Sequence, residues 1–479
     1  MSARKITIEP VTRVEGHGRV TIHLNEQGDV EKTFFHVDEF RGLEKFCEGR
    51  PYFEMPQITQ RICGICPVSH HLAAAKACDH VARVEPTRPA KLLRELMHMG
   101  QIVQSHGLHF FHLAAPDLLL GFDSDPAERN IFGIIRANKE LAVKAVHLRR
   151  YGQEIIQRLG GGKKVHPNLC VPGGVNAPLK TEDRDAIASE LDAMIDIGKI
   201  AVGIARGWLE ANKTLADTFA AFPSGYMGLV DNEGGLQLYD GEIRVKDAGG
   251  KYLAQFKPEA YLSHIAEHVE PWSFLKHPYF RKQGFPGGIY RVGPLGRLNM
   301  IDKIGTPLAD EEFRHFRSIN DEKPIEGSLY YHYARMIEVL YGLERIGQLL
   351  DDPDIMSKDV RNYSSSSTAQ LPSHGVGVIE APRGTLIHDY STDENGLLTR
   401  VNLIVATGHN NWAMHTASGA VAKAFVKGNA LTEGMLNRVE AAIRCYNPCL
   451  SCSTHAIGKM PLEITLISAD DKVLDRISR

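Results

Sequence analysis

Two cysteine pairs, one near each end of the chain, are the residues best suited to do chemistry. The first lies in RICGICPVSHH, residues 61–71, and the second in YNPCLSCSTH, residues 446–455. In each pair the intervening turn holds both sulfurs on the same side, where they can bind one ion. Thiolates are soft donors that suit zinc, nickel, copper(I) and iron–sulfur clusters. The spacing therefore predicts a metal centre with four thiolate ligands: Cys63, Cys66, Cys449 and Cys452.

A structural zinc site is the simplest alternative for these cysteines. In a zinc ribbon, however, the two pairs normally close a loop of about 15–20 residues, whereas here most of the chain separates them. A histidine also follows each pair, His70 and His455, as expected where a second metal or a supporting hydrogen bond is needed. Both features favour a site that organises the whole protein, and metal analysis distinguishes the two.

The composition is typical of a soluble globular protein. The chain has 479 residues, 43% of them hydrophobic and 24% charged, with a formal net charge of −3, so neither nucleic acid nor a membrane surface is an expected partner. No run of about 18 apolar residues predicts a membrane span, and MSARKITIEP lacks the apolar core of a secretory signal. We therefore expect a cytoplasmic location. In that reducing compartment eight cysteines are too few for a disulfide framework and favour metal chemistry.

The elements that must position the cysteines are mainly helices. Apolar residues recur at helical spacing in four long segments, near residues 90–115, 130–162, 183–216 and 328–350. They predict a central bundle of long helices. Two further helices are expected near residues 412–427 and 431–445. The histidines of SHGLHFFH lie at i, i+3 and i+6, where the outer two diverge around a helix, so we expect packing rather than metal binding.

The predicted fold class is α+β, mainly α. We expect one large domain over residues 1–455, followed by a C-terminal extension over 456–479 that contains two short strands. Its parts are a β-rich N-terminal segment, a helical core in two stretches, a β-rich excursion, and a C-terminal segment that carries the second cysteine pair. Their ranges are 1–60, 89–221 with 306–353, 222–305, and 354–455.

Both cysteine motifs resemble the signatures of the large, catalytic subunit of nickel–iron hydrogenases. The segments RVEGHGRV, RGLEKFCEGR, EAPRG and VATGHNNW also resemble that family, occur in its order and extend over nearly the whole chain. RICGICPVSHHLAAAKA and the 24 residues after His455 are most similar to the soluble, NAD-reducing bidirectional branch. The resemblance implies the fold of that subunit and the reaction H2 ⇌ 2H+ + 2e−, with NAD+ reduced on a partner.

The resemblance also implies the metals. Cys63 and Cys449 would be terminal nickel ligands, and Cys66 and Cys452 would bridge nickel to an iron that carries carbon monoxide and cyanide. A Mg2+ or Fe2+ ion at a second site would be bound by three groups: the carboxylate of Glu44, the imidazole of His455 and the backbone carbonyl of Leu403.

Further residues match family positions around the metals. Glu15, in RVEGHG, resembles the proton-transfer residue, and Arg383 resembles an arginine held above the open coordination position, with Pro382 beside it. Asp117 would hold that arginine. The family's last motif usually begins Asp-Pro-Cys, whereas this chain has Asn447, which cannot supply a second carboxylate. Two more implied contacts are hydrogen bonds to a cyanide and to a bridging thiolate, from Thr407 and His70.

The electron acceptor is expected on another polypeptide. HGVGVIEAPRG has only the first two glycines of a dinucleotide fingerprint, and the four other cysteines, 47, 78, 170 and 445, do not make a cluster motif. We expect neither NAD nor an iron–sulfur cluster on this chain. The implied partners are a small iron–sulfur subunit, diaphorase subunits with flavin, iron–sulfur clusters and the NAD site, and a maturation endopeptidase that cuts after His455.

Three alternatives within this fold remain open. One is a hydrogenase that uses NADP or another soluble carrier. Another is a hydrogen-sensing binding protein, which the extension over 456–479 disfavours because the family's sensors lack a removable tail. A scaffold related to respiratory complex I would have lost the cysteines, and all four are present.

Overall fold

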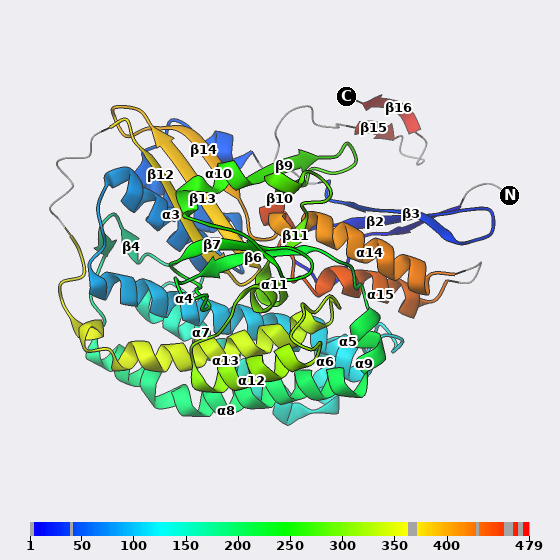
Figure 1. The fold of residues 1–479 in the computed structure, drawn as a ribbon, viewed down its shortest axis with the longest axis horizontal. Helices are drawn as coiled ribbons and strands as arrows, with labels where there is room; N and C mark the ends of the chain where they lie inside the picture. Colours follow the sequence, from blue (N-terminus) through cyan, green and yellow to red (C-terminus); the bar gives the residue numbers. More distant parts are fainter. Residues whose placement is uncertain are drawn as a thin grey trace.

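Long helices form one side of the molecule in this computed structural model, which describes residues 4–38, 42–362, 371–427, 431–454, 463–467 and 473–478. They lie side by side in the lower half of Figure 1, with α4 against α7 and α13, and α13 against α8. Their bounds are α4 (Arg88–Leu108), α7 (Lys139–Leu159), α8 (Thr181–Ala211) and α13 (Tyr330–Asp351). The predicted central bundle is confirmed.

Capping residues set where these helices begin. The Thr87 hydroxyl accepts a hydrogen bond from the amide of Ala90 at the start of α4, and the Asn138 side chain accepts from Leu141 at the start of α7. After α4 the helix widens into a π-turn, His109–Ala114, and continues as α5 (Ala115–Leu120). Such turns frequently occur at functional sites.

The histidines of SHGLHFFH have separate partners. The His106 Nε2 lies 2.9 Å from the Glu338 carboxylate, and the His109 Nε2 lies 2.8 Å from the carbonyl oxygen of Arg444. Their role is therefore to join helices, as expected from their spacing.

Two β-rich segments were predicted, and both are present. Near the N-terminus β1 (Arg4–Ile8), β2 (Arg19–Leu24) and β3 (Val30–His36) form an antiparallel sheet in that order. Residues 222–305 contain a four-stranded sheet of order β11-β6-β7-β8 and the separate pair β9–β10. Their bounds are β6 (Gly225–Val230), β7 (Glu242–Lys246), β8 (Tyr252–Phe256), β9 (Ile265–Val269), β10 (Lys276–Phe280) and β11 (Tyr290–Arg291).

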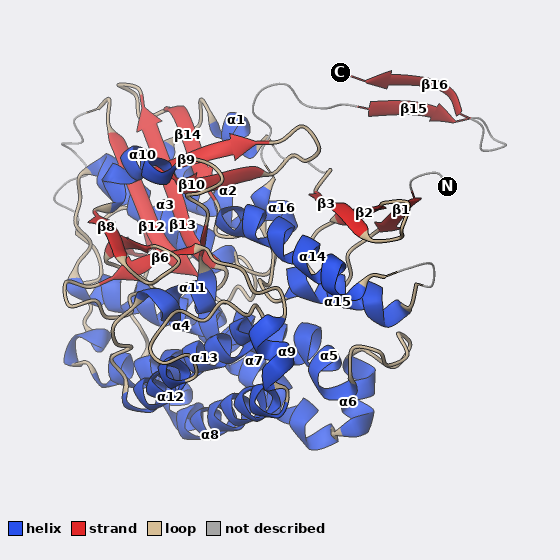
Figure 2. Ribbon diagram, turned by 45° about the vertical axis from the view of Figure 1, so that its right-hand side comes forward, coloured by secondary structure: helices blue, strands red, loops and turns tan. Residues whose placement is uncertain are grey.

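A third sheet, absent from the sequence-based expectations, carries part of the site. It contains β12 (His374–Ala381), β13 (Gly384–Thr392) and β14 (Leu398–Ile404), all antiparallel, and α3 (Pro67–Ala82) packs against it (Figure 2). Glycines permit this close approach: a Cβ at Gly377 would lie 2.0 Å from the carbonyl oxygen of Ala73. The segment HGVGV is thus a strand pressed against the helix that follows the first cysteine pair.

The C-terminal region is helical, and its first helix packs against the N-terminal strand β3. Helices α14 (Asn411–Phe425) and α15 (Glu433–Arg444) confirm the two predicted there, and the short α16 (Leu450–Ser453) follows. The two predicted tail strands are β15 (Glu463–Ile467) and β16 (Val473–Ser478), an antiparallel pair. The protein is a mixed α+β structure, mainly helical, as predicted. In the part of the chain described, no helix is long and apolar enough to cross a membrane.

Candidate metal centre

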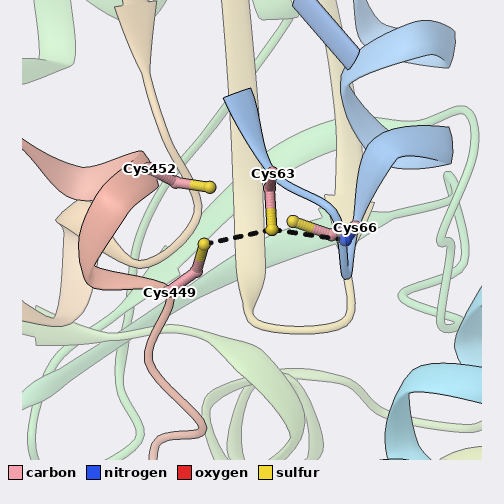
Figure 3. A group of neighbouring side chains, drawn as sticks. All are labelled: Cys63, Cys66, Cys449 and Cys452. Atoms are coloured by element: carbon pink, nitrogen blue, oxygen red, sulfur yellow. Dashed lines mark hydrogen bonds between the residues drawn. The ribbon is translucent and has the colours of Figure 1, made fainter. Parts of the chain in front are cut away.

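The four motif cysteines meet at one buried point (Figure 3). Their sulfurs all lie within 4.8 Å of one another, and Cys63 Sγ is 3.2 Å from Cys449 Sγ. Each side chain is at most 5% exposed. Within the described ranges no other group of histidine, cysteine or carboxylate side chains comes together in this way. The predicted convergence of the two pairs is therefore present in the fold.

The electrostatics of the cluster favour a bound cation. Burial raises the pKa of the Cys449 and Cys452 thiols well above their usual value, whereas hydrogen bonds from Cys449, Cys452 and Cys63 lower the pKa of Cys66. Four thiolates cannot all carry charge in a buried site without a compensating cation. Since metal ligands must be deprotonated, this set of soft donors fits a thiophilic metal centre.

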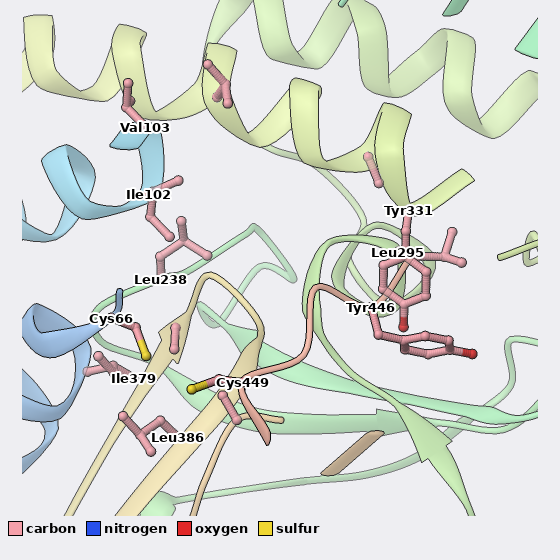
Figure 4. Close-up of a cluster of buried hydrophobic side chains, with 14 of the residues drawn as sticks. Cys66, Ile102, Val103, Leu238, Leu295, Tyr331, Ile379, Leu386, Tyr446 and Cys449 are labelled. Carbon is pink, nitrogen blue, oxygen red and sulfur yellow. The ribbon is translucent and has the colours of Figure 1, made fainter. Parts of the chain in front are cut away.

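Part of the wall around the sulfurs is apolar. Figure 4 shows Ile379 and Leu386 near Cys66 and Cys449. Both apolar side chains are at most 1% exposed and belong to the same hydrophobic core as the cysteines. Water is thereby kept from the sulfurs, and in such surroundings each nearby charge acts more strongly than it would in water.

The N-terminal loop closes one side of the site and brings Glu15 to it. Glu15 pairs with Cys449 in a parallel bridge. Its carbonyl accepts from the amide of Leu450 at 3.0 Å, and its carboxylate accepts from the amide of Ser451 at 3.2 Å. The next residue, Gly16, has φ +82°, and a Cβ there would lie 2.8 Å from the Ser451 nitrogen. Only glycine allows this approach, which explains why Glu15 stands in a glycine-flanked loop.

Arg383 also lies close to the cysteines. Pro382 and Arg383, both buried, form the two-residue turn between β12 and β13. Arg383 donates from Nε to the carbonyl of Asn447 at 2.6 Å and from Nη2 to its side-chain oxygen at 3.2 Å, while Nη1 has no hydrogen-bond partner in the described structure. Burial lowers the pKa of Arg383, but the negative charges of the sulfurs, Cys66 foremost, outweigh burial and raise it overall.

Asp117 does not hold Arg383, contrary to the expectation from the sequence. Its carboxylate accepts hydrogen bonds from Arg13, Asn437 and Arg444. Two guanidinium groups therefore already satisfy it, whereas the two bonds of Arg383 go to Asn447. Asn447, which stands in place of the aspartate expected there, is itself the partner of Arg383. It accepts through its backbone carbonyl and its side-chain amide oxygen instead of a carboxylate.

Thr407 and His70 both contact the cysteine segments. The Thr407 hydroxyl accepts from the amide of Cys449 at 3.0 Å and so fixes the second pair. His70, one turn into α3, interacts with Cys66 and lowers its thiol pKa further. Its Nδ1 lies 3.2 Å from His388 Nε2.

Two of the three groups expected at the second ion also lie together. Helix α1 (Leu43–Cys47) places Glu44 beside β14, and the amide of Leu403 donates to the Glu44 carboxylate at 2.8 Å. His455 lies outside the described residues. Thr454, which precedes it, forms a bridge with Leu275.

Several residues near the site were not found from the sequence. His388 and Tyr390 lie behind His70, and Arg13 and Arg444 hold Asp117. The polar run HDY after an apolar segment was the only available signal for the first two. No sequence signal pointed to the two arginines, which are 431 positions apart along the chain.

Replacing Arg383 by lysine is expected to lower activity by about 10², the scale for losing one preorganised donor, with nickel content unchanged. A lysine ammonium carries its donors on one nitrogen and lacks the planar fork with which the guanidinium bonds Asn447 twice and still directs Nη1 elsewhere. Hydrogen uptake assays and metal analysis check this. Arg400→Lys is the control, since that side chain is 44% exposed and pairs with Asp389. Activity of the Arg383 variant within a few-fold of wild type would contradict the assignment.

Comparisons with known proteins agree with this geometry. Residues 41–123 and 224–455 match a family described as nickel-dependent hydrogenase, and residues 5–40 match one described as HoxL-like. The chain is 40% identical over its full length to the full-length "NAD-reducing hydrogenase HoxS subunit beta" of Cupriavidus necator. It is 44% identical, over 88% of its length and all of the relative's, to a polypeptide of the F420-non-reducing hydrogenase vhu of Methanocaldococcus jannaschii.

Among solved structures, an NAD+-reducing [NiFe]-hydrogenase in the H2-reduced state is similar throughout. The TM-score is 0.91 at 44% sequence identity, and the match covers 95% of this chain and 100% of that one.

Proposed function

The chain belongs to the nickel-dependent hydrogenase family and is a catalytic hydrogenase subunit, and on this basis we propose that its electrons pass through a cluster-bearing partner to NAD+. The observation that carries the catalytic part of the proposal is the convergence of four buried cysteine sulfurs. The similarity to an NAD-reducing hydrogenase along the whole chain supports NAD+ as the acceptor.

The cysteines would divide into terminal and bridging ligands. Cys63 and Cys449 would bind nickel alone, and Cys66 and Cys452 would bridge it to an iron with carbon monoxide and cyanide ligands. When bound, such a centre binds and polarises hydrogen. A Mg2+ or Fe2+ ion near β14 would be held by Glu44, the carbonyl of Leu403 and His455; the Glu44–Leu403 contact supports this site.

The protein's own groups handle the proton and the charge. Glu15, half-buried and held against the Cys449 segment, would accept the proton released when hydrogen is split. Arg383 would place a fixed positive charge beside the sulfurs, where it acts strongly because water is excluded. Thr407 and His70 would donate hydrogen bonds to a cyanide and a bridging thiolate. Pro382, whose ring fixes φ, would limit movement of the turn that carries Arg383.

Partner subunits would complete the electron path. We expect a small iron–sulfur subunit close to the cysteines and diaphorase subunits with flavin, clusters and the NAD site, all in the cytoplasm, with neither NAD nor a cluster on this chain. The test is purification with native partners, metal analysis, and an assay of hydrogen-dependent NAD+ reduction. Reduction of NADP+ or another carrier in place of NAD+ would favour the alternative acceptor. Nickel and iron at full content without turnover would favour a hydrogen sensor.

Removal of the C-terminal extension is expected to complete the site. Cys452 lies in the buried α16, and only three residues, ending with His455, separate it from the extension. A maturation endopeptidase would cut there once nickel is in place, so that His455 becomes the last residue. Mass spectrometry of the active, nickel-loaded protein checks this. A chain intact through Arg479 with full activity would rule out the maturation step.

A further inference from the structure

A buried line of hydrogen-bonding groups runs from Cys66 into β13. His70 interacts with Cys66, its Nδ1 lies 3.2 Å from His388 Nε2, and the His388 Nδ1 lies 2.5 Å from the Tyr390 hydroxyl. His70 is 2% exposed, and His388 and Tyr390 are fully buried. Exchange with water cannot satisfy these groups, so each ring nitrogen must be matched within the line.

With both imidazoles neutral, two arrangements of hydrogens satisfy the line. A neutral imidazole carries one N–H and one acceptor nitrogen, and burial keeps His388 neutral by lowering its pKa well below the usual value. In the first, every group donates toward Cys66: the Tyr390 O–H to His388 Nδ1, the His388 Nε2–H to His70 Nδ1, and the His70 Nε2–H to the sulfur. In the second, each imidazole donates toward Tyr390. In the second case the lone pair of His70 Nε2 faces Cys66.

The sulfur decides between the two. As a metal ligand Cys66 is a thiolate, which accepts hydrogen bonds and repels a lone pair. The first arrangement also gives the phenol hydrogen of Tyr390 an acceptor on His388; burial raises the pKa of Tyr390, so this hydrogen is retained.

We propose that His388 and Tyr390 are positioning residues that hold His70 in the tautomer with its hydrogen on Nε2, directed at the Cys66 sulfur. The tautomer assignment rests on the hydrogen-bond line and on the proposed role of Cys66 as a thiolate ligand, and its electronic consequence rests on the proposed bridging role of Cys66. A hydrogen bond to a thiolate withdraws electron density from the sulfur and so raises the reduction potential of the metals it binds. Without the Tyr390 hydroxyl, His388 no longer has a donor at Nδ1 and can carry its hydrogen there. His70 then donates from Nδ1 to His388 Nε2, and the donor to Cys66 is lost.

The direct test locates the hydrogens. Neutron crystallography of the hydrogenase complex is expected to place hydrogens on Tyr390 Oη, His388 Nε2 and His70 Nε2. A hydrogen on His70 Nδ1 would overturn the proposal, whatever metal the site contains. This measurement does not depend on the proposed acceptor or on turnover, so its failure is distinguishable from failure of the proposed function.

Variants give a second, spectroscopic test. Tyr390→Phe is expected to leave nickel and iron contents unchanged, to shift the electron paramagnetic resonance of nickel, to lower its midpoint potential and to reduce activity about 10-fold. Tyr151→Phe is the matched control, since that buried phenol donates to the Ile187 carbonyl at 3.0 Å between α7 and α8. A Tyr390 variant with the resonance and potential of wild type would contradict the proposal.

A pair of substitutions separates hydrogen bonding from packing. The amide of His388→Gln can still donate to His70, whereas His388→Leu cannot. We expect the glutamine variant to keep a spectrum close to wild type and the leucine variant to show the shift seen with Tyr390→Phe. Equal shifts in both would mean that His388 only fills space.

Discussion

Replacing any one of the four metal-site cysteines by serine is expected to abolish hydrogenase activity and nickel retention. A serine hydroxyl is a hard donor that stays protonated at neutral pH, so it cannot take the place of a thiolate on a soft metal. The site is too buried for water to substitute as a ligand, since none of the four side chains is more than 5% exposed. Nickel content by mass spectrometry and hydrogen uptake of each purified variant test the expectation.

Cys170→Ser provides the control for these variants. Cys170 is also 5% exposed but lies in β4 (Cys170–Val171), outside the sulfur cluster. We expect it to keep nickel and most activity, with at most a modest loss of stability. A motif variant that retained full nickel and near-normal activity would contradict the four-thiolate assignment for that position.

Glu15→Gln is expected to lower hydrogen oxidation by about 10² or more, the usual scale for losing a general base. The amide oxygen can still accept from the Ser451 amide, which the Glu15 carboxylate does at 3.2 Å, so the loop should keep its place against Cys449. What is lost is the ability to accept a proton. Hydrogen–deuterium exchange activity should fall with hydrogen oxidation, while nickel and iron contents stay normal.

Glu31→Gln is a suitable comparison for this variant. Glu31 is an exposed carboxylate on β3, in the same N-terminal sheet, so the same loss of charge there should leave activity unchanged. If Glu15→Gln retained activity within a few-fold of wild type, another group would have to accept the proton.

The long helices and the metal site were predictable because their signals are local. Helical periodicity over twenty residues reflects one buried face, and a C-x-x-C turn holds two sulfurs together whatever surrounds it. The resemblance to the hydrogenase family then assigned roles to Glu15 and Arg383, and the fold places both beside the sulfurs.

The partners of buried charges were not predictable in the same way. Asp117 was assigned to Arg383, but Arg13 and Arg444 bind it, and no local pattern joins positions so far apart. The sheet β12–β13–β14 was missed because two of its strands, β12 and β13, are buried on both faces. They therefore lack the alternation of polar and apolar residues by which a half-buried strand is recognised.

The bridge between Glu15 and Cys449 also has a consequence for how the protein is made. Cys63 and Cys449 are 386 positions apart, and a ribosome adds roughly 5–20 residues per second, so the first thiol pair emerges about 20–80 s before the second. During that interval Cys63 and Cys66 have no partner pair, and the N-terminal loop has no strand on which to dock. Translation therefore leaves the metal pocket until last, and a chain that ended early would present two open thiols to oxidants and stray metals.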